Sequence, residues 1–253
     1  MSRSAWKTHA LRLIALVALC TLALQIVFAG RIALMAVVDP QSTSFQRSEA
    51  WRLAVEQQRI RWSQQWVDGE RISPHLKRAV IASEDGGFID HGGVDWEAIE
   101  KAWERNERAE ARAQARAEKA PARQGRPAVP KIVGGSTITQ QLAKNLLLSG
   151  ERTVLRKAQE LVLALMLEGL LSKERILEIY LNNVEWGEGV FGAQAAARHY
   201  FRVDAAQLAP QQAARLAVML PAPKRFEKRP ASPYLLSRSA TIVARMNDVE
   251  LPK

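Results

Sequence analysis

Residues 83–93 of this chain read Ser-Glu-Asp-Gly-Gly-Phe-Ile-Asp-His-Gly-Gly. The segment before them has apolar residues at helical spacing, and the pair Ser73-Pro74 is typical of a helix start, with a hydroxyl cap followed by proline at the first helical position. Glycines follow Glu84 closely, so this residue is expected at the end of the helix. A carboxyl group at such a junction is easily desolvated, which raises its pKa and suits it to proton transfer. Glu84 alone is equally consistent with a helix that simply ends in solvent.

A second polar block, residues 134–145, reads Gly-Gly-Ser-Thr-Ile-Thr-Gln-Gln-Leu-Ala-Lys-Asn. We expect a helix that begins with Ser136 as its cap and ends at Gly150. The two glycines before it let backbone N–H groups approach a ligand, and the start of a helix attracts anions. The hydroxyl, amide and ammonium groups that could bind a ligand there are those of Ser136, Thr137, Thr139, Gln140, Gln141 and Lys144. Adjacent glutamines cannot share one helical face, so one of them could equally face water on an ordinary capped helix.

Further cations follow this block at Arg152, Arg156 and Lys157. Cations gathered near a helix start are suited to a phosphate or pyrophosphate group. Glu160 comes four residues after Arg156, so the two side chains can pair on one helical face. A solvated surface ion pair is the alternative interpretation of that pairing.

The N-terminal segment indicates a membrane anchor. Residues 13–30 are apolar except for Thr21 and Gln25, which is about the length that a bilayer-spanning helix needs. Three basic residues precede this segment, so the positive-inside rule predicts a cytoplasmic N-terminus and an exported domain. A cleaved signal peptide is the alternative, but the run is long and apolar residues continue to residue 38. We therefore assign residues 1–38 to a cytoplasmic N-terminus and transmembrane anchor.

The remaining residues, 39–253, contain no internal repeat and no long β-alternation. Their pattern predicts one all-α domain. Helical patterns are expected from near residue 95 and over residues 154–171, 173–182, 192–201 and 207–220. Residues 104–132 form a basic insertion that is rich in alanine and arginine and has almost no large apolar residue, so it cannot bury a core face. We expect a solvated helix or loop there, with a basic arm that contacts anionic lipid as the alternative. The net charge of +10 likewise favours an anionic partner.

Taken in order, five blocks resemble the peptidoglycan glycosyltransferases of bacterial cell-wall synthesis. The resemblance covers residues 72–223. The first three blocks are Glu84-Asp85 with Phe88, His91 and Gly93; residues 134–145; and Arg156-Lys157 with Glu160. The last two are Arg175 to Asn182 with Gly187, Gly192 and Tyr200-Phe201, and Ala213-Ala214 to Pro223. Each block is weak by itself, whereas the five together in this order are specific. The resemblance implies a lysozyme-like helical catalytic domain, periplasmic, on a single-pass anchor in the bacterial inner membrane. The chain ends at Lys253, so we expect a monofunctional enzyme without a transpeptidase domain.

The resemblance also implies a reaction. Glu84 would be the general base that deprotonates the 4-hydroxyl of an incoming lipid II, whose oxygen attacks the growing glycan chain with inversion and release of undecaprenyl pyrophosphate. Glu160 would assist on the leaving-group side or hold the basic residues in place. The substrate and pyrophosphate would be bound by Ser136, Thr137, Gln140, Gln141, Lys144, Asn145, Arg152 and Arg156.

Cofactors and partners follow from the same resemblance. It implies help from a divalent cation, Mg²⁺ or Mn²⁺, whose ligands the sequence leaves unknown, and no organic cofactor. The expected partners are lipid II, the growing glycan chain, the inner membrane and other cell-wall synthesis proteins, with no nucleic acid.

Two other classes of protein remain as rivals. A lytic hydrolase also uses a glutamate in a helical fold, but it would not need the cations Lys144, Arg152 and Arg156 around a leaving group. A membrane-anchored scaffold would explain the anchor and the charge, but not the two polar loops around Glu84 and Ser136.

Overall fold

The computed structural model describes residues 3–119, 135–148, 150–151 and 153–252. Its helices are α1 (Arg3–Leu34), α2 (Ser44–Gln57), α3 (Pro74–Glu84), α4 (Trp96–Lys119), α5 (Ile138–Leu147), α6 (Val154–Leu170), α7 (Lys173–Asn183), α8 (Ala193–Phe201), α9 (Pro210–Met219), α10 (Pro223–Glu227) and α11 (Pro233–Arg245). Short 3₁₀ helices lie at Gly69–Arg71, Ala205–Gln207 and Met246–Asp248. The predicted all-α class is confirmed.

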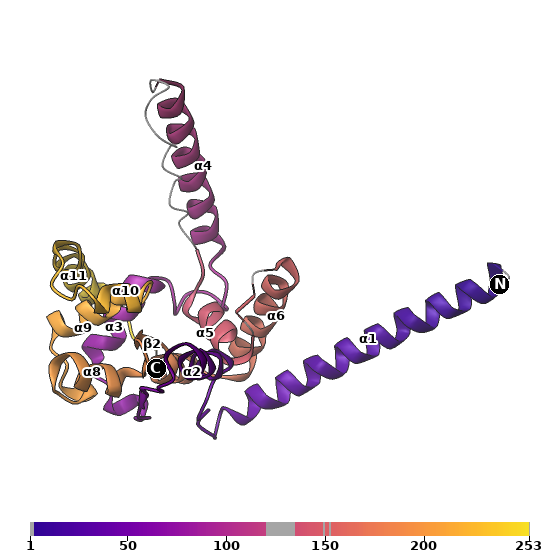
Figure 1. The fold of residues 1–253 in the computed structure, drawn as a ribbon, viewed down its shortest axis with the longest axis horizontal. Coiled ribbons are helices and arrows are strands. Elements are labelled where there is room, and N and C mark those ends of the chain that lie inside the picture. Colours follow the sequence, from indigo (N-terminus) through magenta and orange to yellow (C-terminus); the bar gives the residue numbers. More distant parts are fainter. Residues whose placement is uncertain (1–2, 120–134, 149, 152, 253) are drawn as a thin grey trace.

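Helix α1 extends away from the rest of the molecule (Figure 1). Its segment Trp6–Leu34 has 29 residues and a mean hydropathy of 2.5. Its side chains are mostly exposed, but Ile32 near its end is buried. At 1.5 Å per residue it rises about 44 Å, more than the hydrocarbon thickness of a bilayer. The amide groups of Gln25 and Gln159 exchange two hydrogen bonds of 2.8 and 3.0 Å, which join α1 to α6. Length, apolar surface and position are those of a membrane anchor.

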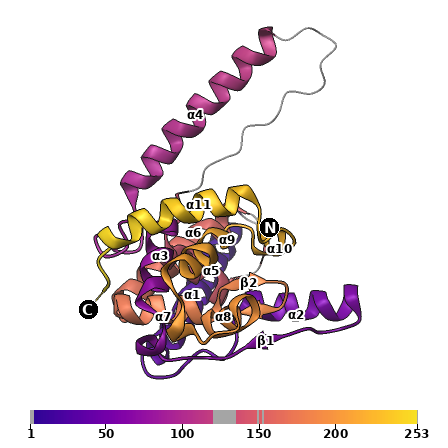
Figure 2. The same ribbon diagram turned by 90° about the vertical axis from the view of Figure 1, so that its left-hand side faces the viewer.

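The helices of the body pack around one hydrophobic core. Helices α3, α9 and α11 contact one another, and α5 packs against α6 and α7. Figure 2 shows α11 lying across this assembly, above α9 and α3. The largest fully buried side chains are Trp186, Tyr180 and Phe88. Burial of these apolar surfaces supplies the main stabilising term, because the only cysteine, Cys20, forms no disulfide.

Local sequence explains the start and end of α3. Ser73 is its N-cap and accepts a hydrogen bond from the backbone N–H of His75, and Pro74 occupies the first helical position. The buried residues Leu76, Ala79 and Val80 lie on one face, at helical spacing. The predicted helix is therefore confirmed, including Glu84 as its last residue.

Helix α5 begins one residue later than predicted. Its N-cap is Thr137, whose hydroxyl accepts from the N–H of Gln140, while Ser136 is exposed; the expectation that Ser136 caps the helix is wrong. Thr137 is preferred because its hydroxyl also donates to the backbone carbonyl of Gly93, 2.7 Å away, in a buried position. The helix ends at Leu147, before the predicted stop at Gly150.

A small sheet of strands β1 (Ser63–Gln64), β3 (Val190–Phe191) and β2 (Glu185–Gly187), in that order, lies beside α8. Strand β1 is parallel and β2 antiparallel to β3. Gly189 lies in the turn between β2 and β3 with a φ of 71°, and a Cβ atom there would lie 2.0 Å from the carbonyl oxygen of Arg61. Strands of two or three residues are too short to show a β-alternation in the sequence.

The insertion continues α4 outward from the body (Figures 1 and 2). Residues 104–119 are helical, and residues 104–115 are mostly exposed. Arg108 and Glu104 pair across one helical turn at 3.0 Å, which suits a solvated helix. Residues 120–132 of the predicted insertion lie outside the described residues.

Asn182 ties α7 to the extended segment before α3. Its Oδ1 accepts from the N–H of Val67 and its Nδ2 donates to the Val67 carbonyl, both at 2.9 Å, with Asn182 fully buried. We expect Asn182→Ala to lower the free energy of unfolding by about 2–4 kcal/mol, because it leaves two buried backbone groups unsatisfied. Chemical denaturation in detergent measures this change. Glu174→Gln, at an exposed position of the same helix, is the matched control, and an equal effect in both variants would contradict the prediction.

Candidate active site

Glu84 lies in a cavity between the end of α3 and the start of α5. The cavity, of about 190 Å³, is lined by Ser83, Glu84, Asp85, Gly86, Asp95, Ala98, Arg105, Gly135, Ser136 and Thr137. We call it the Glu84 cavity. Burial raises the pKa of Glu84, and hydrogen bonds from Gln141 and Ser83 only partly oppose this effect. The group thus has the desolvated carboxyl expected of a base, and it does not simply end its helix in solvent.

The two adjacent glutamines of α5 have different partners. Gln141 donates from Nε2 to Glu84 Oε2 at 3.0 Å, and its Oε1 accepts from the hydroxyl of the buried Tyr180 at 3.0 Å. The tyrosine therefore fixes which end of the Gln141 amide faces Glu84. Gln140 is buried and accepts from the N–H of Thr137, so its amide completes the helix cap.

Asp85 joins the two polar blocks across 53 residues of sequence. Its Oδ2 accepts from the N–H of Ile138, the first residue of α5, at 2.9 Å, and its Oδ1 contacts His91 Nε2 at 2.8 Å. The hydrogen bond to Asp85 raises the pKa of His91. Sequence reasoning missed this buried bridge, because nothing in the local pattern shows which helix start a carboxylate will reach.

Glu160 is a buried anion with two cationic partners. It is 3% exposed, Arg156 Nη1 lies 3.0 Å from its Oε2, and Lys157 Nζ contacts its Oε1. The interpretation as a solvated surface pair is therefore wrong. Lys157 Nζ also reaches Ser136 Oγ at 3.4 Å, on the wall of the Glu84 cavity.

A second cavity, of about 430 Å³, adjoins the first through Gln141. Its lining consists of Phe45, Gln141, Lys144, Asn145, Leu148, Gly150, Arg156, Val184, Glu185, Leu220 and Pro223. We call it the cationic cavity, for Lys144 and Arg156. The positive charge of Lys144 reaches Glu84 and acts to lower its pKa. The candidate base Glu84 thus lies on one side of Gln141, and the cations Lys144 and Arg156 lie on the other side.

The predicted site residues are largely brought together. Glu84, Ser136 and Thr137 line the first cavity, and Gln141, Lys144, Asn145 and Arg156 line the second. Glu160 lies behind Arg156, and Gln140 lies within the helix cap. Arg152 lies outside the described residues.

Glu185 is a cavity residue that sequence reasoning did not single out. Its side chain is 8% exposed, on the wall of the cationic cavity, and Lys224 Nζ lies 3.3 Å from its Oε1. Burial raises the pKa of Glu185 to about 7. Its position directly between the apolar residues Val184 and Trp186 is the sequence signal that could have marked it.

One cluster in the described residues has the composition of a metal site. Ligand atoms of Asp85, His91 and Asp95 lie within 4.8 Å of one another. However, hydrogen bonds already engage both oxygens of Asp85 and both nitrogens of His91, which accepts at Nδ1 from the N–H of Gly93. Asp95 Oδ1 accepts from the N–H of Ala98. These residues fit a hydrogen-bonded network and do not fit a divalent cation, so we derive no step through one.

Comparison with known proteins supports the motif analysis. Residues 53–247 match the family model described as Transglycosylase. The chain is 49% identical over 239 residues to the biosynthetic peptidoglycan transglycosylase of Paraburkholderia xenovorans (strain LB400), covering 94% of this chain and 91% of that relative. It is 53% identical over 214 residues to the protein so named in Bordetella pertussis, covering 85% and 82%. The corresponding protein of Burkholderia pseudomallei is 50% identical over 231 residues, covering 91% and 83%.

The Gln141 contact makes a prediction about pH. Its N–H stabilises the charged form of Glu84, so Gln141→Leu should raise the pKa of Glu84 further and shift the acid limb of the activity profile upward by about one pH unit. The pH dependence of kcat/KM measures the shift. Tyr180→Phe keeps the Gln141 donor and loses only its orienting partner, so a smaller shift is expected. An unchanged acid limb in folded Gln141→Leu would contradict this role.

Proposed function

The chain belongs to the transglycosylase family and is a peptidoglycan glycosyltransferase, and on this premise we propose that it polymerises lipid II into glycan strands. The observation that carries the proposal is the pairing of a desolvated carboxyl, Glu84, with an adjoining cavity walled by Lys144 and Arg156. A sugar hydroxyl is a poor nucleophile and needs a base. A pyrophosphate leaving group needs cations more than it needs a proton donor.

Glu84 acts as the base in this proposal. Its carboxylate takes the proton of the 4-hydroxyl of an incoming lipid II, and the oxygen attacks the anomeric carbon of the growing chain. The bond to undecaprenyl pyrophosphate breaks as the new glycosidic bond forms, so a single displacement inverts the anomeric centre. Gln141 holds the Glu84 carboxylate in one orientation for this step, which is supported by its two hydrogen bonds.

The leaving group develops its charge on the other side of Gln141. Lys144 and Arg156 line the cationic cavity, which supports a role for them in stabilising the pyrophosphate. Arg152 is assigned to the same task from the sequence alone. Glu160 holds the cations Arg156 and Lys157, because both of its oxygens contact them. We therefore assign Glu160 a positioning role.

Two features support a transferase at a membrane. Hydrolysis of a glycan has no anionic leaving group, so it would not use the cations of the cationic cavity. The basic residues Arg3, Lys7 and Arg12 lie in the N-terminal part of α1, before its apolar run, which supports a cytoplasmic N-terminus and a catalytic domain on the periplasmic face of the inner membrane. Dependence on a divalent cation and contacts with other cell-wall synthesis proteins stay predictions.

Replacement of Glu84 tests the proposal. We expect Glu84→Gln in the full chain to lower kcat/KM for lipid II by at least about 100-fold, because the amide cannot accept the proton. Its oxygen can still accept from Gln141, so the thermal unfolding temperature should change little. Separation of labelled glycan products measures polymerisation.

Glu97→Gln, on the exposed face of α4, is the matched control and should keep full activity. Substantial polymerisation by folded Glu84→Gln would refute the assignment of the base. Shortening of preformed glycan by the wild-type protein, without polymer formation, would support the lytic alternative.

A further inference from the structure

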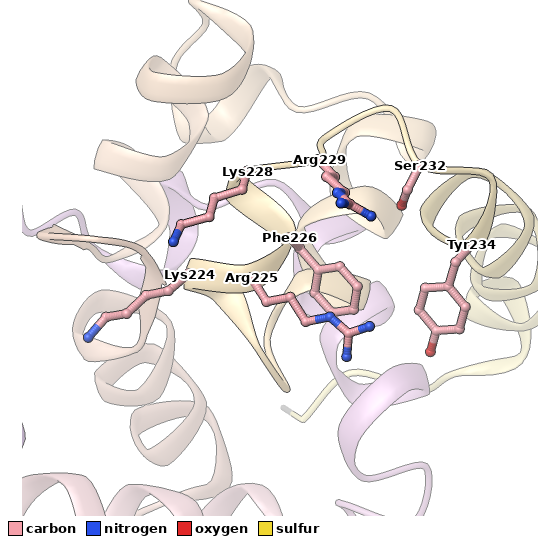
Figure 3. A pocket seen from close by; sticks show the side chains of 7 residues that line it. All are labelled: Lys224, Arg225, Phe226, Lys228, Arg229, Ser232 and Tyr234. Atoms are coloured by element: carbon pink, nitrogen blue, oxygen red, sulfur yellow. The ribbon is translucent and has the colours of Figure 1, made fainter. Parts of the chain in front are cut away.

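A basic pocket lies between α10 and the start of α11, outside the two cavities already described. It has a volume of about 880 Å³ and is lined by Lys224, Arg225, Phe226, Lys228, Arg229, Ser232 and Tyr234 (Figure 3). We call it the α10 pocket. Nothing in the proposed displacement step uses these side chains.

Most of the charge of this pocket is unbalanced. In the part of the chain that the structure describes, Arg225, Lys228 and Arg229 form no ion pair, whereas Lys224 pairs with Glu49 and Glu185. The neighbouring acid, Glu227, is engaged elsewhere. Its Oε2 accepts from the N–H of Glu188 at 2.9 Å, and its Oε1 lies 3.5 Å from His199 Nε2. Three exposed cations close in sequence repel one another, and a bound anion would relieve this repulsion.

The side chains of this pocket place guanidinium groups beside two aromatic rings. The rings of Phe226 and Tyr234 are parallel, with centroids 5.7 Å apart and an interplanar angle of 5°. The Arg225 guanidinium lies 5.9 Å from the Phe226 ring centroid, and Figure 3 shows it and the Arg229 guanidinium on two sides of that ring. The Ser232 side chain lies near Arg229 in the same view. Guanidinium groups bind carboxylates and phosphates through paired N–H donors, and an aromatic ring limits their motion.

The pocket begins where the cationic cavity ends. Pro223 lines that cavity and the next residue, Lys224, lines the α10 pocket. Lys224 also pairs with Glu185 on the cavity wall. A polymer bound at the reaction site could therefore extend into the α10 pocket without crossing the core.

The position of the α10 pocket relative to the anchor limits which class of anion can reach it. Helices α10 and α11 lie on the side of the body opposite to the direction in which α1 extends (Figure 1). A lipid headgroup or a lipid-linked pyrophosphate stays near the bilayer that α1 crosses. The anion that reaches the far side has to belong to the part of the substrate that leaves the membrane.

We propose that the α10 pocket binds carboxylates of the peptide side chains carried by the glycan strand. This inference rests on the proposed function, since it assumes that the strand is made in the adjoining cavities. The sugars of the strand are held together by neutral linkages, whereas its peptides have free carboxylates at physiological pH. Arg225 and Arg229 form the charge-assisted hydrogen bonds, and the Phe226–Tyr234 wall packs on the aliphatic part of the peptide.

A binding measurement tests the pocket directly. The double variant Arg225→Gln/Arg229→Gln is compared with Arg238→Gln/Arg245→Gln, which removes the same charge from exposed positions of α11 outside the pocket. Calorimetric titration of the full chain in detergent uses a soluble muropeptide with free carboxylates as the probe. We expect the pocket variant to bind at least about tenfold more weakly than the wild type, and the control variant to bind like the wild type. Amidation of the muropeptide carboxylates should remove the difference.

Further measurements distinguish peptide carboxylates from other anions, such as lipid headgroups. Equal muropeptide binding by both double variants would overturn the proposal, and so would loss of sedimentation with anionic phosphatidylglycerol vesicles in the pocket variant alone. If the double variant fails to fold, Arg229→Gln replaces it, because the Arg229 side chain has no hydrogen bond or ion pair among the described residues. A wild-type chain that binds the muropeptide but does not polymerise lipid II would refute the proposed function and leave the pocket assignment supported.

Discussion

The carboxylate of Asp85 is the constraint on which the candidate active site depends. It is 7% exposed, yet it is compensated by the N–H of Ile138 at the start of α5 and by His91. The positive end of a helix stabilises an anion, and a hydrogen bond to each oxygen offsets the cost of burial. Because Glu84 directly precedes Asp85, the same contacts that join α3 to α5 place the catalytic candidate beside Gln141. The buried carboxylate of Asp85 thus has a structural role, and it fixes the position of the neighbouring carboxyl group of Glu84.

Two opposing requirements meet at Glu84. A base strong enough to activate a sugar hydroxyl benefits from a desolvated carboxylate, whereas a pyrophosphate leaving group requires nearby cations that would weaken that base. The structure separates these requirements into two adjoining cavities. Gln141 lines the cationic cavity and donates a hydrogen bond to Glu84 in the other cavity. The pKa of Glu84 is raised by burial despite the opposing charge of Lys144. Glu160 contributes by holding Arg156 and Lys157, which keeps positive charge on the leaving-group side.

Much of this arrangement could be predicted from the sequence where the cause is local. The cap at Ser73-Pro74, the spacing of the apolar residues and the glycines after Glu84 predict α3 to its last residue. The order of the polar blocks likewise indicated the family. The cap of α5 was misplaced by one residue because a distant carbonyl, that of Gly93, selects Thr137. The bridge made by Asp85, the cavity position of Glu185 and the short strands depend on residues far apart in the chain, and no periodicity encodes them.

The most direct test of this account is the protonation state of Glu84 in the full chain. Infrared difference titration, with Glu84→Gln used to identify the band, measures it on the carboxyl group itself. We expect one carboxyl band, absent in that variant, that titrates above the ordinary glutamate value of 4.5, because burial raises the pKa of Glu84. A Glu84 that titrates at or below 4.5 would contradict the assignment of a desolvated base.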